Sequence, residues 1–156
     1  MKKKILFLVL GSTILLLPLP SLAQHRDFGL GVIIGEPTGL SWKIWTGGQT
    51  ALAGAAAWSF GENDAFHLHV DYLFHNFRLF RVSRGRLPFY YGVGVRILFH
   101  EKQEADTVVG VRFPLGIEYL FASPSLGIFL EIVPILDLSP ATDFDMNAAV
   151  GFRIYF

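Results

Sequence analysis

The feature that most constrains the fold is the strict alternation of residues 143–156, D-F-D-M-N-A-A-V-G-F-R-I-Y-F. The even positions are all apolar, whereas the odd positions carry Asp143, Asp145 and Arg153 among small or polar residues and one tyrosine. Successive side chains of a β-strand point to opposite faces, so the segment predicts a strand with one apolar face and one polar face. An exported chain that repeats this pattern is expected to form a membrane β-barrel, with its apolar face on lipid.

The same alternation recurs in eight segments, which cover residues 27–34, 40–45, 50–60, 66–75, 89–99, 107–120, 126–136 and 143–156. The pattern is weakest over 50–60, where one face is alanine, a residue that favours helices over sheets. Pro114 and Pro134 each remove a backbone donor, so we expect bulges or frayed pairing beside them. An even number of strands returns both ends to one side, and the last strand can pair with the first. The sequence therefore predicts an all-β, eight-stranded antiparallel up-and-down transmembrane β-barrel.

The start of the chain has the pattern of a secretory signal peptide over residues 1–23. Lysines at positions 2–4 precede an apolar run, and Ser21-Leu22-Ala23 has the small-x-small form of a cleavage site. An uncleaved anchor is the alternative, but the run is shorter than the ~20 residues of a spanning helix. The barrel domain then covers 24–156, and without cysteine it has neither a disulfide nor a lipid-attached Cys.

The composition fits lipid-facing strands better than spanning helices. Hydrophobic residues make up 52% of the chain, yet no good candidate for a spanning helix follows residue 23. Lipid-facing strands account for both observations, because half of each strand must be apolar. The net charge of zero at pH 7 provides no field that would recruit nucleic acid, so we expect no nucleic-acid partner.

The inward-facing positions of the predicted strands collect equal numbers of basic and acidic residues. They are Lys43, Arg96, Arg112 and Arg153, with Asp71, Glu118, Glu131 and Asp145. An eight-stranded barrel is only wide enough for its own side chains, so these charges are expected to pair across the lumen. Strand direction places Arg96, Arg112 and Glu131 at similar heights. A salt-bridged core is the main interpretation of this network, and a gated ion path is the alternative.

One predicted strand carries His67, His69, Asp71 and His75 on its inward face. Histidines two residues apart on a strand can share a metal ion, and a histidine beside a nucleophile can act as a base. No cysteine or second histidine-rich segment completes a metal shell, and no motif surrounds the candidate serines. We therefore expect no metal, no cofactor and no catalysis. A lipid- or lipopolysaccharide-modifying enzyme that uses His67, His69 or Asp71 is the alternative.

A basic segment over residues 76–86 holds Arg78, Arg81, Arg84 and Arg86. We expect a long hairpin that projects beyond the bilayer and keeps its arginines solvated. An arginine cluster of this kind also suits lipid phosphates or an acidic partner. Tryptophan and tyrosine residues near strand ends are expected to form interfacial girdles.

Five stretches are distinctive as sequence motifs: G-L-G-V-I-I-G-E-P-T-G-L-S-W-K (29–43), L-H-V-D-Y-L-F-H (68–75), P-F-Y-Y-G-V-G-V-R (88–96), V-R-F-P-L-G-I-E-Y-L-F (111–121) and the final G-F-R-I-Y-F. They resemble a family of small bacterial outer-membrane β-barrel proteins of unknown function, distantly similar to the OmpA and OmpX type. The resemblance implies that Phe156 is the aromatic signal read by the outer-membrane assembly machinery. It also implies short periplasmic turns, whereas strand counting puts the arginine-rich hairpin at the periplasmic end.

These patterns predict a small integral outer-membrane barrel with a packed polar lumen and a structural or surface-interaction role. Its expected partners are outer-membrane lipid, lipopolysaccharide and the assembly machinery, and we expect a monomer. A lipid-modifying enzyme and a narrow pore are the alternative functions.

Overall fold

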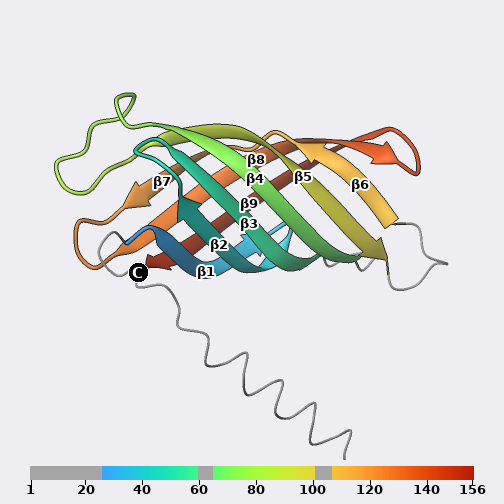
Figure 1. Cartoon of the computed structure of the whole chain (residues 1–156), viewed down its shortest axis with the longest axis horizontal. Helices are drawn as coiled ribbons and strands as arrows, with labels where there is room; N and C mark the ends of the chain where they lie inside the picture. Colours follow the sequence, from blue (N-terminus) through green and yellow to red (C-terminus); the bar gives the residue numbers. More distant parts are fainter. Residues whose placement is uncertain (1–25, 60–64, 101–106) are drawn as a thin grey trace, which may run out of the picture.

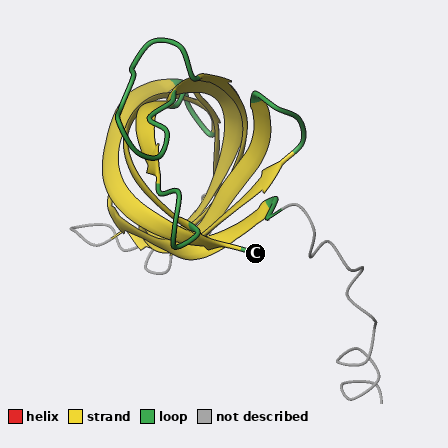
Figure 2. Ribbon diagram, turned by 90° about the vertical axis from the view of Figure 1, so that its left-hand side faces the viewer, coloured by secondary structure: helices red, strands yellow, loops and turns green. Residues whose placement is uncertain are grey.

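The fold is a single antiparallel sheet that closes into a ring. The computed structural model describes residues 26–59, 65–100 and 107–156, so the predicted signal peptide over 1–23 lies outside the described residues. The strands in these ranges are β1 (Phe28–Gly35), β2 (Thr38–Trp45), β3 (Thr50–Ser59), β4 (Ala65–Asn76), β5 (Phe89–His100), β6 (Thr107–Arg112), β7 (Leu115–Leu120), β8 (Leu126–Ser139) and β9 (Asp143–Tyr155). They pair in the order β4-β3-β2-β1-β9-β8-β6-β5-β7, and further pairings of β4 with β5 and of β8 with β7 complete the ring (Figure 1, Figure 2). The described residues form no helix long and apolar enough to cross a membrane.

The ring has eight positions although the sheet has nine strands, because β6 and β7 share one position. The sequence predicts one strand over 107–120, and the structure interrupts it at Phe113 and Pro114. Pro114 has no N–H to donate to the ladder. Hydrogen bonds from the Phe113 N–H to the Pro134 oxygen (2.9 Å) and from the Gly92 N–H to the Pro114 oxygen (3.0 Å) span the break. The predicted antiparallel barrel is confirmed, with one of its strands divided.

The second predicted irregularity, at Pro134, affects one side of β8 only. Pro134 remains inside β8, where it lies opposite Met146 of β9 in an unbroken register. The register shift in this part of the wall lies between Val109 and Gly110, where β6 meets the end of β8. On the other side of β8, however, the ladder with β6 and β7 is interrupted opposite Pro134, where the Phe113 N–H bonds to the Pro134 oxygen. The expectation of irregular pairing is therefore met at Pro114, and at Pro134 on the side that faces β6 and β7.

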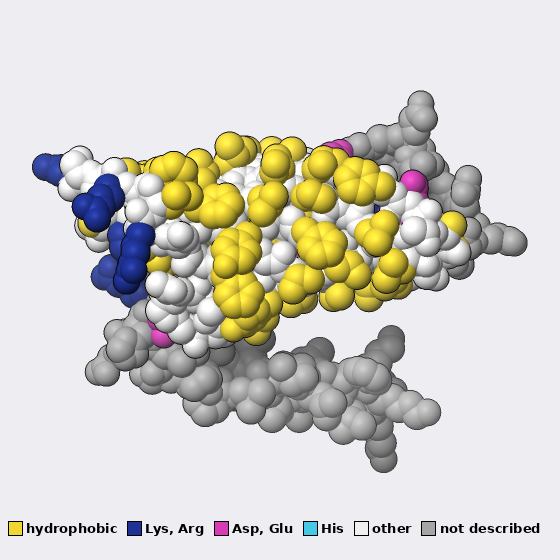
Figure 3. Space-filling view, turned by 90° about the horizontal axis from the view of Figure 1, so that it is seen from above, with side chains coloured by type: hydrophobic (Ala, Val, Ile, Leu, Met, Phe, Trp, Pro, Cys, Tyr) yellow, Lys and Arg dark blue, Asp and Glu magenta, His cyan; other side chains and the backbone are white. Residues whose placement is uncertain are grey.

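Alternation along each strand puts apolar side chains outside the ring and polar ones inside, as the sequence pattern predicts. Leu30 on β1, Val95 on β5 and Val150 on β9 keep 46, 55 and 45% of their surface exposed. Figure 3 shows that the outer surface between the two ends of the ring is mainly hydrophobic. The alanine-rich β3 keeps the alternation with small apolar residues on its inner face, because the alanines at 51, 53, 55 and 57 are all buried.

The ring closes between its first and last strands. β1 pairs with β9 from Gly29 opposite Tyr155 to Gly35 opposite Ala149, as predicted for the closing strand. The start of β1 and the end of β9 therefore lie at one end of the barrel, together with the segments 77–88 and 121–125 (Figure 1). We call this the terminal end, and we call the opposite end, with the turn at 140–142, the far end. The arginine-rich hairpin lies at the terminal end, where strand counting places it.

Glycines at two inward positions make room for aromatic rings. A Cβ atom added to Gly29 would lie 2.6 Å from Cε1 of Tyr155, and one added to Gly151 would lie 2.6 Å from Cε1 of Phe129. Both distances are shorter than real Cβ contacts, so each ring occupies the space that its glycine leaves. The Phe129 ring in turn lies 3.9 Å from Cζ of the Arg153 guanidinium. Small residues in the wall thus set the positions of aromatic and charged side chains in the lumen.

Replacing Gly151 with leucine should overpack the lumen against Phe129 and lower the free energy of unfolding by about 1–3 kcal/mol. The neighbouring Val150 faces outward, so Val150→Leu should change that free energy by less than about 0.5 kcal/mol. Denaturant unfolding of both variants in one detergent, followed by the circular dichroism of the sheet, makes the comparison. Equal stabilities would contradict the placement of Gly151 in the lumen.

Candidate functional site: the charged lumen

The candidate functional site is the set of charged side chains that fills the lumen. The residues selected from the sequence occupy inward positions of the ring: Lys43 on β2, Asp71 on β4, Arg96 on β5, Arg112 on β6, Glu118 on β7, Glu131 on β8, and Asp145 and Arg153 on β9. All are buried except Asp145, whose side chain keeps 47% of its surface exposed. Their contacts form three levels between the terminal end and the far end.

Glu118 is the centre of the level nearest the terminal end. Its Oε2 accepts a hydrogen bond from Lys43 Nζ, and its Oε1 accepts one from the Tyr155 hydroxyl at 2.6 Å. The same Oε1 lies 3.5 Å from Arg153 Nη1, and Arg153 Nε donates to Ser41 Oγ at 2.9 Å. A single buried carboxylate thus ties β2 and β9 to β7 across the lumen.

Arg112 and Tyr90 hold the two carboxylates of the middle level. Arg112 Nε donates to Asp71 Oδ1 at 2.9 Å, and Arg112 Nη2 lies 3.7 Å from Glu131 Oε1. The Tyr90 hydroxyl donates to Glu131 Oε2 at 2.8 Å. Because Arg112 is fully buried, these carboxylates offset part of the free-energy cost of removing its guanidinium from water.

Arg96 forms the level nearest the far end with two aspartates. Its Nε and Nη2 donate to Oδ1 and Oδ2 of Asp137 at 2.9 and 2.6 Å, and its Nη1 lies 3.0 Å from Asp145 Oδ2. A bidentate guanidinium–carboxylate pair is stronger and more specific in geometry than a single contact. Asp137 is therefore the principal partner of Arg96.

Sequence analysis missed Asp137 because the predicted strand ended at residue 136. The structure extends β8 beyond that point with its period of two intact, so Asp137 faces inward like Glu131. The register also differs from the expectation that Arg96, Arg112 and Glu131 lie at similar heights. Arg96 lies opposite Gly110, and Gly110 lies opposite Asp137 on the other side. Extending the alternation by one residue would have found the missing partner.

The three histidines on the inward face of β4 are buried but make few polar contacts. His75 Nε2 lies 2.8 Å from Lys43 Nζ, and His69 Nε2 lies 3.7 Å from Asp71 Oδ2. Among the described residues, neither ring nitrogen of His67 has a hydrogen-bond partner, nor does Nδ1 of His69. Their hydrogen bonds join none of the three to a serine or threonine hydroxyl within the described part of the chain. The same ranges contain no group of three or more His, Asp or Glu residues arranged to hold a metal ion.

The strand order, the closure and the buried charges define a closed antiparallel β-barrel whose lumen is filled by ion-paired side chains. Residues 21–156 match a family described as "Protein of unknown function (DUF3996)", and the chain belongs to this family. The resemblance to a family of unknown function is thus confirmed, together with the barrel fold.

One solved structure shows the same architecture. The chain is similar to the crystal structure of the N-terminal β-barrel domain of Pseudomonas aeruginosa OprF, with a TM-score of 0.58 and 12% sequence identity. The match covers 83% of this chain and 95% of that chain. At this identity the likeness shows the fold alone. A search of curated proteins gave no match.

Asp71→Asn should destabilise the barrel by about 3–5 kcal/mol, because it leaves the buried Arg112 without its nearest carboxylate. Asp145→Asn makes the same chemical change at a half-exposed side chain whose partner, Arg96, keeps Asp137, so it should cost less than about 1 kcal/mol. Adding Arg112→Met to Asp71→Asn should recover part of the loss, because it removes the unpaired charge. Urea unfolding of the four proteins gives these differences. Equal losses of stability in the two asparagine variants, or no recovery in the double variant, would contradict the interpretation of the lumen as a buried, paired network.

Proposed function

We propose that this protein is a small integral outer-membrane β-barrel whose ion-paired lumen is its core, with a structural or surface-interaction role and no catalytic one. The observation that carries the proposal is the inverted placement of charge and apolar surface. Lysine, arginine, aspartate and glutamate side chains are buried in the lumen, while large apolar side chains cover the outside. A contiguous apolar surface of this kind marks contact with a membrane or a partner. A membrane-spanning barrel accounts for both faces of the strands, because its apolar outer face contacts lipid and its polar inner face lines the lumen.

Aromatic side chains gather near both ends of the apolar surface. Towards the far end, the Phe66 ring lies 5.2 Å from Trp58 and 6.3 Å from Phe99 between ring centroids. Towards the terminal end, the Phe74 and Tyr91 centroids are 5.7 Å apart. Aromatic girdles at both interfaces are typical of membrane-spanning barrels. These clusters support the interfacial role predicted for the aromatic residues.

Two further observations support a location in the cell outer membrane. Residues 1–23 have the pattern of a cleaved signal peptide, and the barrel fold, similar to that of the N-terminal domain of OprF, agrees with the resemblance of the sequence to outer-membrane barrels. We propose outer-membrane lipid and lipopolysaccharide as the surroundings of the apolar surface. Because the ring closes within one chain and leaves no sheet edge, we propose a monomer.

The outer-membrane assembly machinery is the proposed partner during insertion, with Phe156 as its signal. The Phe156 side chain is exposed, and its N–H donates to the Phe28 oxygen at 2.8 Å. The residue therefore sits at the seam between β1 and β9 with its ring available for contact. This role is inferred from the resemblance to other outer-membrane barrels.

Arginine substitutions on the outer face test the membrane location. Val150 lies near the middle of β9, where an arginine should cost about 2–4 kcal/mol at the bilayer midplane, whereas the cost near an interface falls to about 0–1 kcal/mol. Phe144→Arg, close to the far end of the same strand, is the matched control for Val150→Arg. Unfolding from phospholipid vesicles measures both. Equal small costs, or recovery of the wild-type protein as a soluble periplasmic protein on fractionation, would overturn the proposal.

A narrow pore is the second candidate function, and the middle of the lumen favours it. Nη1 and Nη2 of Arg112 have no hydrogen-bond partner among the described residues, so the polar contacts of the middle level are incomplete. A packed core predicts that the wild-type protein is silent in planar-bilayer recordings. A pore predicts conductance that increases in Glu131→Ala, which removes a carboxylate of the middle level. Conductance by the wild-type protein would replace the packed-core proposal.

A further inference from the structure

The terminal end of the barrel carries positive charge that nothing in the described lumen balances. The charged residues described there are Asp27 and the arginines Arg26, Arg78, Arg81, Arg84 and Arg86. Figure 3 shows basic side chains gathered at this end of the molecule, with a small acidic patch beside them, and further acidic side chains at the other end. Lumen carboxylates are engaged by buried cations, as in the Lys43–Glu118 and Arg112–Asp71 pairs. Within the described residues, none of the five arginines forms an ion pair with a carboxylate.

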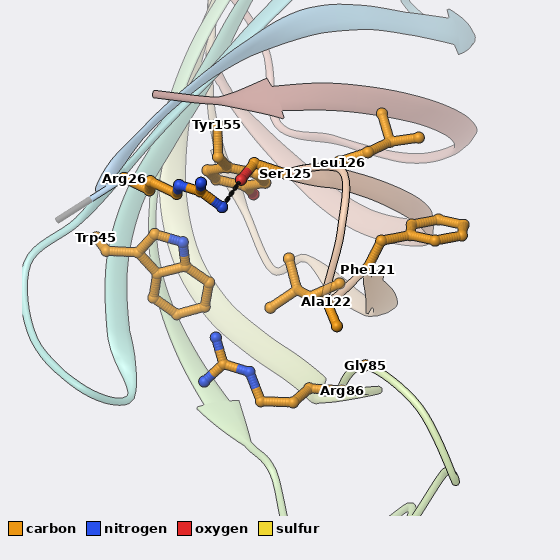
Figure 4. A pocket seen from close by; sticks show the side chains of 10 residues that line it. Arg26, Trp45, Gly85, Arg86, Phe121, Ala122, Ser125, Leu126 and Tyr155 are labelled. Carbon is orange, nitrogen blue, oxygen red and sulfur yellow. Dashed lines mark hydrogen bonds between the residues drawn. The ribbon is translucent and has the colours of Figure 1, made fainter. Parts of the chain in front are cut away.

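Two of these arginines, Arg26 and Arg86, line cavities at the mouth of the barrel. Both border a cavity of about 320 Å³, which Phe121 and Tyr155 also line, and a second cavity of about 260 Å³. Trp45 borders both cavities as well. Figure 4 shows the two guanidinium groups and the Trp45 ring around the same space, each from a different segment of the chain.

The backbone fixes Arg86 at this place. Its N–H donates to the Leu120 oxygen at 2.9 Å, and its oxygen accepts from the Leu120 N–H at 2.7 Å, which continues the sheet beyond β7. Its guanidinium lies 5.0 Å from the centroid of the Phe77 ring. The ring orients the guanidinium by a cation–π contact but leaves its N–H donors available for an anion.

Arg26 and Trp45, the other two members of the mouth, are also held by contacts other than ion pairs. Arg26 donates from Nη1 to the Ser125 hydroxyl in the turn between β7 and β8 (Figure 4). The backbone N–H of Trp45 donates to the backbone oxygen of Asp27 at 2.8 Å. The centroid of the Trp45 indole ring lies 4.1 Å from Nζ of the buried Lys43. The larger cavity therefore has two guanidinium groups, an aromatic wall and no carboxylate among its described lining residues, whereas Asp27 lines the smaller cavity.

We propose that the larger cavity of this mouth is a binding site for a phosphate group, held by Arg26 and Arg86 beside Trp45. A guanidinium binds phosphate through two parallel hydrogen bonds, and a phosphate has enough oxygens to accept from both arginines. Phe121, which lines the same cavity, is 38% exposed and continues into the apolar outer surface. The headgroup of a membrane lipid is thus one source of the phosphate, and free phosphate is the other. The lipid source rests on the proposed membrane location, whereas the phosphate chemistry does not.

The test titrates the folded, full-length mature protein in non-ionic detergent with inorganic phosphate and, separately, with a short-chain phosphatidic acid. Isothermal calorimetry measures the Kd. The double variant Arg26→Gln/Arg86→Gln should raise the Kd at least about tenfold for any phosphate that the wild-type protein binds. The matched control is Arg81→Gln/Arg84→Gln, which removes the same charge from exposed residues that line neither cavity. It should change the Kd by less than about twofold at physiological salt, because screening weakens attraction between separated charges. Heat-modifiable migration in gels verifies that each variant is folded.

Each outcome decides a different point. Tighter binding of phosphatidic acid supports a headgroup site, and equal binding supports a site for free phosphate. Wild-type binding of neither ligand overturns the site, and so do equal losses in the two double variants, because they would show general attraction to the basic end. A folded membrane barrel that binds no phosphate leaves the proposed function standing. A water-soluble protein that binds phosphate through Arg26 and Arg86 overturns the membrane location and keeps the site.

Discussion

A ring of eight strand positions encloses a space that side chains alone can fill, so every charge inside it needs a partner on another strand. Two of the lumen ion pairs join strands that are not neighbours in the sheet: Lys43 on β2 contacts Glu118 on β7, and Asp71 on β4 contacts Arg112 on β6. These contacts cross the barrel where a soluble protein would have an apolar core. The free energy of the fold therefore depends on the pairs being complete, because a single buried charge without a partner is strongly destabilising.

The same constraint explains why the inner wall is rich in glycine and alanine. A long charged side chain fits into the lumen only if the residues beside it in the sheet are small. Each of three lumen charges lies in register between two such residues. Lys43 lies between Gly29 and Ala53, Glu131 between Gly116 and Ala149, and Arg153 between Gly31 and Gly127. Charge pairing and the small residues are thus parts of one packing arrangement.

The faces of the strands could be predicted from the sequence, because a period of two is a local property of the chain. The contacts across the lumen could not, because they depend on register, and register depends on turns and irregularities in distant strands. The register in which Gly110 lies between Arg96 and Asp137 puts Arg96 beside Asp137 and away from the level of Glu131. The mouth at the terminal end likewise depends on contacts between segments that are distant in the sequence. Arg26 and Arg86 are far apart in sequence, and only the closure of the ring and the bridge to Leu120 bring them to one cavity.

The unequal charge of the two ends has a consequence for how such a barrel is placed in a bilayer. Carrying a guanidinium group through hydrocarbon costs more free energy than carrying a carboxylate. The end with the five arginines is therefore the harder one to translocate, and the end near Asp143 and Asp145 is the easier one. A barrel that inserts from one side of the membrane leads with its acidic end and leaves its arginines on the side from which it came. For the proposed membrane barrel, the orientation would therefore be set by charges that do not cross the bilayer, since the outer face of the strands is apolar in either direction.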